Sequence, residues 1–267
     1  MHFRFSAASV LALLTLVGGA HAEQCPGNPN ALGTSRVIAI DPAEHKKLGT
    51  LQYLETLPLR DHEVVLNFDD GPLPPHTSHV LDALSAECVK ATFFLVGQMA
   101  KEHPAVVQRE YDDGHTIGTH TEHHAHLDKI SAEAARKEIT DGIASVNKAL
   151  GKANAVAPFF RFPYLDQTHI AEDYALQKGL MVWSVDFFVS DWNRITPEQV
   201  VNFALERIER RQKGMLLLHD IQQRTAAALP LLLRELKKRG YHIVHIVPAD
   251  GAHPKTDTKS DRWAAIN

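Results

Sequence analysis

The chain has 267 residues, a length that allows one large domain or two small ones. Hydrophobic residues make up 44% and charged residues 22%, ordinary values for a globular protein with a sizeable core. This composition excludes disorder, collagen-like repeats and a polytopic membrane protein. With 28 Lys and Arg against 32 Asp and Glu, the net charge is −4, and no basic arm favours nucleic acid as a partner. The unusual count is histidine, at 17.

Residues 1–22 have the pattern of a cleaved signal peptide. Arg4 supplies the positive charge, an apolar run extends from Ala7 to Val17, and Ala20-His21-Ala22 forms a small-x-small cleavage site. This run is too short to cross a bilayer comfortably, and no other stretch is long enough. We therefore expect an exported protein, periplasmic or secreted, without a transmembrane segment after cleavage. A buried N-terminal helix is the alternative.

Cys25 and Cys88 are the only cysteines, and neither belongs to a CxxC motif, so a zinc-thiolate or thioredoxin-type site has no support. In an oxidising compartment the two could form one disulfide between the N-terminal segment and the domain. Two free thiols are the alternative, because the sequence gives no distance between them.

From about Glu63 onwards, apolar runs alternate with amphipathic segments. Seven runs are typical of strands: Val64–Phe68, Ala91–Val96, His115–Thr119, Pro158–Phe162, Leu180–Asp186, Met215–His219 and Tyr241–Val247. Three helices are expected: one from Ser131 to just before Gly151, one opening on the capping box of Thr196 and Gln199, and one over residues 226–239. This alternation predicts an α/β fold with a parallel sheet, closed or wound.

The chain divides into four predicted parts: the signal peptide, an N-terminal extension over residues 23–60, a domain over 61–248, and a polar C-terminal tail over 249–267. The extension holds one candidate strand at Val37–Ile40. We expect the tail to be mobile and assign it no function.

Polar residues cluster where the predicted strands end, which is where parallel α/β folds place their chemistry. These residues are Asp69-Asp70, His120, Arg161, Asp186, Asp191 and His219-Asp220. Taken singly, each has an ordinary explanation, such as a solvated Asp-Gly turn, a packed histidine or a surface ion pair.

His120 and His124 lie four residues apart, on one face if the segment is a helical turn. Neutral imidazole is the usual nitrogen ligand of Zn²⁺. With one carboxylate from Asp70, the pair predicts a His₂Asp metal site that leaves positions open for water and substrate. A solvated histidine-rich turn is the alternative.

Five motifs in order resemble those of the polysaccharide deacetylases of carbohydrate esterase family 4, the NodB-homology domain. They are Asn67-Phe68-Asp69-Asp70, His120-Thr121-Glu122-His123-His124, Arg161-Phe162-Pro163-Tyr164, Asp191-Trp192 and Leu217-Leu218-His219. The resemblance covers about Glu63 to Val247. It implies a distorted (β/α)7-type barrel of mostly parallel strands with surrounding helices.

The resemblance also implies a role for each matched residue. Asp70, His120 and His124 would hold a divalent metal, Zn²⁺ or alternatively Co²⁺, that polarises a water and the N-acetyl carbonyl. Asp69 would be the general base, kept ionised by a bidentate pair with Arg161, and His219 the general acid, with its pKa raised by Asp191. The backbone N–H of Tyr164 would bind the oxyanion, and Leu217 and Trp192 would wall the acetyl pocket.

Three departures from the family pattern bear on the substrate and the fine-tuning of the site rather than on the reaction. They are Asn67 in place of Thr or Ser, Leu165 after Tyr164 in place of Gly, and the apolar run Phe187-Phe188-Val189-Ser190. The implied substrate is an acetylated amino-sugar polymer or oligomer: chitin oligomers, peptidoglycan GlcNAc or poly-N-acetylglucosamine. An O-acetylxylan esterase, a catalytically silent glycan-binding module and a periplasmic metal-binding protein are the alternatives.

Overall fold

The computed structural model describes residues 25–152, 155–166, 168–256 and 263. The predicted signal peptide lies outside the described residues, as does most of the C-terminal tail. Ten strands are described: β1 Thr34–Ile40, β2 Lys47–Leu48, β3 Glu63–Asp69, β4 Thr92–Leu95, β5 Thr116–Thr119, β6 Phe159–Phe160, β7 Met181–Trp183, β8 Phe187–Phe188, β9 Gly214–His219 and β10 His242–Pro248. Seven α-helices accompany them: α1 His76–Ala86, α2 Gly97–Glu102, α3 Pro104–Asp112, α4 Ala132–Leu150, α5 His169–Gln177, α6 Pro197–Arg211 and α7 Gln223–Lys238.

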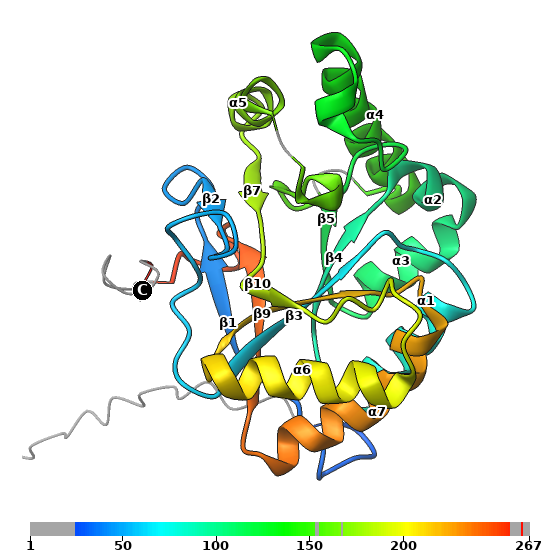
Figure 1. The fold of residues 1–267 in the computed structure, drawn as a ribbon, viewed down its shortest axis with the longest axis vertical. Helices are drawn as coiled ribbons and strands as arrows, with labels where there is room; N and C mark the ends of the chain where they lie inside the picture. Colours follow the sequence, from blue (N-terminus) through cyan, green and yellow to red (C-terminus); the bar gives the residue numbers. More distant parts are fainter. Residues whose placement is uncertain (1–24, 153–154, 167, 257–262, 264–267) are drawn as a thin grey trace, which may run out of the picture.

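The strands form a curved parallel sheet with helices around it (Figure 1). Around the curve the order is β8-β9-β3-β4-β5-β6-β7-β2, while β10 and β1 continue from the start of β3. Every described pairing is parallel, and no ladder between described strands joins β7 to β8, so the barrel stays open there. The predicted α/β class, a distorted barrel of mostly parallel strands, is confirmed.

Burial explains why these segments become strands. All seven residues of β3 are buried, as expected for a parallel strand covered on both faces. One apolar core lies between the sheet and the helices. A second core, which includes Phe94, Trp183 and Met215, is formed by side chains of strands from different parts of the curved sheet.

The predicted helices at Ser131 and Thr196 are confirmed by their caps. Ser131 Oγ accepts a hydrogen bond from the Ala134 N–H, and α4 ends at Gly151 in the left-handed region. Thr196 and Gln199 form the expected capping box. The third helix, α7, begins at Gln223 rather than at residue 226.

Two predicted strands differ from the structure in length. The run Pro158–Phe162 pairs only at Phe159–Phe160, and the run Leu180–Asp186 pairs only at Met181–Trp183, before the separate short strand β8. The next residues leave the ladder: Arg161, directly after β6, donates through its side chain to the carbonyl of Ser184, directly after β7.

The N-terminal extension contributes to the same sheet. The candidate strand at Val37–Ile40 is confirmed as part of β1, which pairs with β10, while β2 pairs with β7. The expected mobility of the C-terminal tail stays a prediction, but two of the tail residues that the structure describes contact the N-terminal extension. Thr256 hydrogen-bonds to Ala39 through both its backbone and its hydroxyl, and Trp263 is buried.

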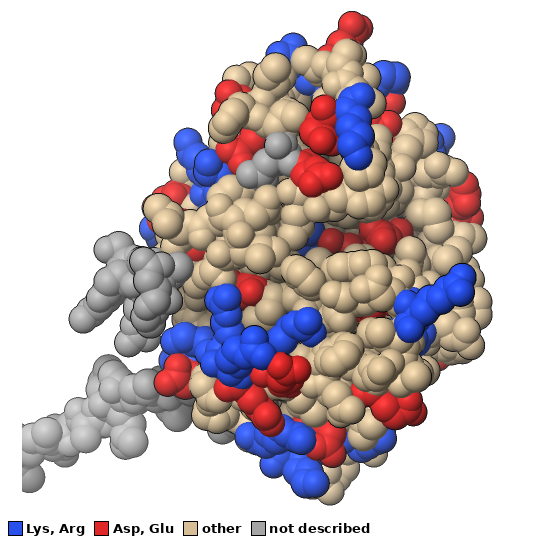
Figure 2. All heavy atoms as spheres, viewed as in Figure 1, with Lys and Arg blue, Asp and Glu red and all other residues tan. Residues whose placement is uncertain are grey.

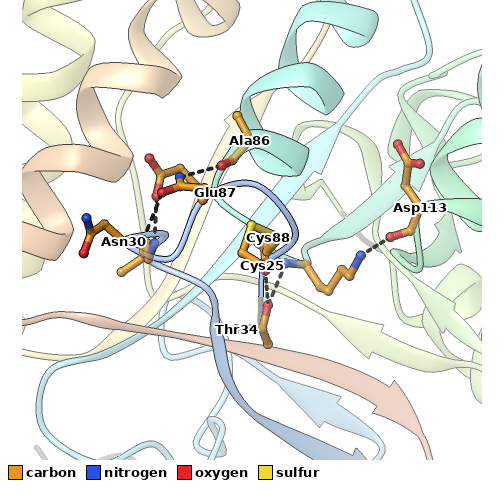
Figure 3. Close-up of a disulfide and its surroundings, with 10 residues drawn as sticks. Cys25, Asn30, Thr34, Ala86, Glu87, Cys88 and Asp113 are labelled. Carbon is orange, nitrogen blue, oxygen red and sulfur yellow. Dashed lines mark hydrogen bonds between the residues drawn. A yellow bond between two sulfur atoms is a disulfide. The ribbon is translucent and has the colours of Figure 1, made fainter. Parts of the chain in front are cut away.

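The structure joins Cys25 to Cys88 in a disulfide, which confirms this pairing over two free thiols (Figure 3). The bond fixes the start of the described chain to the turn after α1. The backbone N–H of Lys90 also donates to Thr34 Oγ1 at 2.8 Å. The N-terminal segment is therefore held covalently and by hydrogen bonds.

The surface carries both signs of charge. In Figure 2, Lys and Arg lie among Asp and Glu on the face shown rather than in one continuous basic area. Within the described part of the chain, no helix has the length and apolar composition needed to cross a membrane.

Candidate active site

Strand register brings the predicted polar residues to one rim of the sheet. Asp69 pairs with His219 across β3 and β9. Thr119 pairs with Phe160 across β5 and β6, so the residues that follow, His120 and Arg161, also emerge side by side. Four of the candidate residues are therefore placed by backbone pairing alone.

Asp70, His120 and His124 converge as the sequence predicts. One ligand atom from each side chain lies within 4.8 Å of the others. Asp70 Oδ1 is 3.1 Å from His124 Nε2 and 3.5 Å from His120 Nε2. The segment between the histidines is a loop, however, and the helical turn assumed from their spacing is wrong. Left-handed backbone at Asp70 and His124 (φ 76° and 55°) turns the side chains toward one another instead.

The protonation of these side chains suits a metal ion. His120 Nδ1–H donates a hydrogen bond to the Arg161 carbonyl at 2.8 Å. The other ring nitrogen, Nε2, is therefore available to ligate a metal ion. Burial lowers the pKa of His120 to about 4, so the ring is neutral near pH 7. Burial raises the pKa of Asp70, but the neighbouring histidines outweigh it and hold that pKa well below its usual value. Asp70 Oδ1 is buried and has no well-aligned hydrogen-bond donor among the described residues. A cation would satisfy this oxygen, so the donor set fits a divalent metal.

Buried contacts hold the histidine loop. Glu122 accepts a hydrogen bond from Ser145 at 2.7 Å and forms an ion pair with Lys101. A Cβ at Gly97 would lie 2.2 Å from Glu122 Oε2, and one at Gly142 would lie 2.5 Å from the Thr121 backbone. The loop therefore packs directly on α2 and α4. Only glycine allows this close approach at Gly97 and Gly142, because it has no side chain.

Arg161 contacts Asp69 from inside the barrel. Its Nη1 donates to Asp69 Oδ1 at 2.6 Å, and its Nη2 donates to the Ser184 carbonyl at 3.0 Å. The predicted bidentate pair is wrong, because Ser184 takes the second nitrogen, with Asn67 Oδ1 at 3.5 Å. One Asp69 oxygen is thus left outside the ion pair, 3.8 Å from His120 Nε2.

His219 and Asp191 form a second charged pair. The His219 ring donates from Nδ1 to Asp191 Oδ1 at 2.8 Å, and its backbone N–H donates to Oδ2 at 2.8 Å. Burial lowers the pKa of His219, but the hydrogen bond and charge of Asp191 outweigh it and raise that pKa to about 9. The ring is therefore protonated near neutral pH, with Nε2 free of this pair.

The three candidate pocket residues differ in exposure. Tyr164 is 53% exposed, with its ring edge-on to His124 at 4.5 Å between centroids. Trp192 is 47% exposed and lies T-shaped against His219 at 5.4 Å. Leu217 is buried in β9, two residues before His219 and so on the same side of the strand.

Two residues that contact Asp191 were not identified from the sequence. Thr225 Oγ1 donates to Asp191 Oδ2 at 2.5 Å, and Arg224 donates to the Asp191 carbonyl at 2.6 Å. No sequence motif marks Thr225 or Arg224. Their contacts with Asp191 join residues more than 30 positions apart, which only the fold brings together. Asp186, which also follows a predicted strand, instead bonds to the backbone of Thr50 and Met215 as a structural residue.

Comparisons with known proteins identify relatives of this chain. The family model described as polysaccharide deacetylase matches residues 57–183. A peptidoglycan-N-acetylmuramic acid deacetylase of Bacillus subtilis is 30% identical over 241 residues, 86% of this chain and 89% of the relative. A chitooligosaccharide deacetylase of Sinorhizobium fredii is 32% identical over 213 residues, 72% of this chain and 95% of the relative.

Other matches are longer than this chain. A peptidoglycan-N-acetylglucosamine deacetylase of Listeria monocytogenes is 34% identical over 189 residues, but the chain spans only 38% of its length. Among solved structures, a peptidoglycan deacetylase of Bdellovibrio bacteriovorus has a TM-score of 0.72 at 28% identity, covering 92% of this chain and 67% of that one. The fold is an open parallel α/β barrel, and its site combines a candidate metal cluster with two charged pairs, as in a hydrolase. The chain belongs to the polysaccharide deacetylase family.

Proposed function

We propose that this protein is an exported, metal-dependent hydrolase that removes N-acetyl groups from a GlcNAc-containing poly- or oligosaccharide. The observation that carries the proposal is the arrangement of two charged pairs, Asp69–Arg161 and His219–Asp191, around one metal-type cluster. A binding module would need no such combination. The family membership supports the same reaction.

Asp70, His120 and His124 would hold the ion. A divalent cation there would supply Lewis acidity toward the acetyl carbonyl and lower the pKa of a water molecule. Zn²⁺ is the ion that two imidazoles and one carboxylate favour, with Co²⁺ as an alternative.

The chain's own residues would move the protons. Asp69 would accept the proton of the attacking water with the carboxylate oxygen outside the Arg161 contact. His219, protonated because Asp191 raises its pKa to about 9, would donate a proton from Nε2 to the leaving amine nitrogen. The Tyr164 N–H would donate a hydrogen bond to the acetyl oxygen as negative charge develops.

The exposed rings favour a glycan as substrate. Tyr164 and Trp192, each against one of the site histidines, offer apolar faces for a sugar ring and its acetyl group. The relatives are named for peptidoglycan and chitooligosaccharide. We therefore propose acetylated amino-sugar chains of one of these types, with poly-N-acetylglucosamine as a third member of the class.

Export is supported by two observations. The N-terminal residues have a signal-peptide pattern, and the structure contains the Cys25–Cys88 disulfide, a bond typical of oxidising compartments. The proposed site of action is therefore the periplasm or the exterior.

The test is acetate release from chitooligosaccharides, peptidoglycan, poly-N-acetylglucosamine and acetylated xylan, each with Zn²⁺, with Co²⁺ and after chelation. Metal-dependent release from an N-acetylated glycan supports the proposal, with Asp69→Asn as the inactive control. Release from acetylated xylan alone would assign an O-acetyl esterase instead. Glycan binding without release would assign a silent binding module.

A further inference from the structure

Two consecutive residues near the metal-type cluster have backbone geometry that disfavours ordinary side chains. Tyr164 and Leu165 both have φ of 58°, in the left-handed region that glycine occupies freely. Such conformations persist only where the surroundings hold them. What holds this loop therefore matters to the direction of the Tyr164 N–H.

His126 is the side chain placed to hold it. Its imidazole lies flat on the Tyr164 ring, with centroids 3.7 Å apart and planes within 6°. The same imidazole contacts Asp166 Oδ2 through Nδ1 at 3.1 Å. Because Tyr164 and Asp166 belong to one turn, His126 contacts this turn at two side chains.

His126 also connects two different segments of the site. It lies two residues after His124, on the loop that carries the histidines of the metal-type cluster, while Tyr164 and Asp166 follow Arg161. Tyr164 is itself edge-on to His124 at 4.5 Å. The stack therefore fixes the turn that holds the Tyr164 N–H relative to the cluster.

Among the described residues, further hydrogen bonds reach the backbone of the turn. The backbone N–H of Leu165 donates to Phe162, and that of Asp166 donates to Pro163, both within the turn itself. From the N-terminal extension, Gln52 Nε2 donates to the Leu165 carbonyl at 2.8 Å. More than half of the surface of Tyr164 is exposed, so burial does little to fix its ring.

We propose that His126 is a positioning residue for the deacetylation reaction: by stacking on Tyr164 it holds the Tyr164 N–H where the acetyl oxygen develops charge. This inference rests on the proposed function and adds to it a residue outside the five motifs. In this proposal His126 acts through Tyr164 rather than on the reacting atoms. Stacking carries the effect, so a flat apolar ring can replace the imidazole.

The experiment compares His126→Ala, His126→Phe and His123→Ala with the wild type. His123 is the matched control, because it lies on the same loop but is 56% exposed and pairs with Glu138 instead. Displacing one oxyanion donor costs roughly 10²-fold in kcat, and partial loss of its support is expected to cost about 10-fold or more. We expect this loss of kcat in His126→Ala with little change in KM, and values within about threefold of wild type in His126→Phe and His123→Ala.

Hydrogen exchange gives a readout that needs no activity. Amides of residues 164–166 are expected to exchange faster in His126→Ala and at the wild-type rate in His126→Phe and His123→Ala. Unchanged exchange and kcat in His126→Ala would overturn the proposal, and so would equal losses in the Ala and Phe variants. If the wild type releases no acetate from any glycan, the proposed function fails, while exchange still decides whether His126 holds the turn.

Discussion

Replacing Asp191 by Asn tests the general-acid assignment through the pH dependence of the rate. With Asp191 present, the pKa of His219 lies at about 9 rather than at the ordinary 6.5, a difference worth about 3 kcal/mol between its two protonation states. Asn keeps the shape but removes the charge, and burial then favours neutral imidazole. The alkaline limb of the rate profile is therefore expected to move down by about two pH units or more. Fewer His219 rings would therefore stay protonated at pH 8 in the variant than in the wild type.

The assay is kcat/KM for acetate release between pH 5 and pH 10 in both proteins. A divalent ion at Asp70 would lower the pKa of His219 in both alike, so the difference between the two profiles is the informative quantity. The acid limb is expected to stay in place, because Asp69 keeps its contact with Arg161. If the alkaline limb stays in place in Asp191→Asn but shifts when Zn²⁺ is exchanged for Co²⁺, the general-acid assignment is refuted. The limb would then report deprotonation of a metal-bound water instead.

Three other predictions concern the remaining parts of the site and fold. Asp69→Asn is expected to abolish turnover with metal content unchanged by elemental analysis, whereas His120→Ala loses both. Arg161→Lys keeps the charge but not the separate bonds to Asp69 and Ser184, so kcat is expected to fall at least about 10-fold in steady-state assays. Replacing Cys25 and Cys88 by Ser opens a link between residues 63 apart and is expected to cost about 4 kcal/mol in denaturant unfolding.

Each of these has a contradicting result. Equal loss of metal in Asp69→Asn and His120→Ala would argue against separate roles for the two neighbouring carboxylates. An Arg161→Lys variant with wild-type kcat would show that the buried guanidinium is structural only. Unfolding curves that coincide with and without the disulfide would show that the N-terminal segment contributes little to stability.

The sequence predicts the parts of this protein that depend on local periodicity and spacing. The helix from Ser131 and the capping box at Thr196 appear as predicted, since caps and amphipathic faces are local signals. The positions of Asp69, His120, Arg161 and His219 follow from strand ends, because parallel strands end at one rim.

Other features depend on contacts between distant residues and leave no local signal. The histidine loop forms no helical turn; instead, Glu122 packs against Gly97 of α2 and Thr121 packs against Gly142 of α4. Arg161 makes a single contact with Asp69, since the Ser184 carbonyl takes its second nitrogen. The packing of Thr256 on Ala39 likewise depends on a strand more than 200 residues earlier.

The central claim is a metal-dependent hydrolysis of N-acetyl groups, and one measurement tests it most directly. Acetate release is followed from an N-acetylated glucosamine oligomer with the protein as purified, after chelation, and after Zn²⁺ is restored. The account predicts release that chelation abolishes and Zn²⁺ restores, and none from His124→Ala under any condition. Release that persists after complete removal of metal, or that His124→Ala retains, would contradict it.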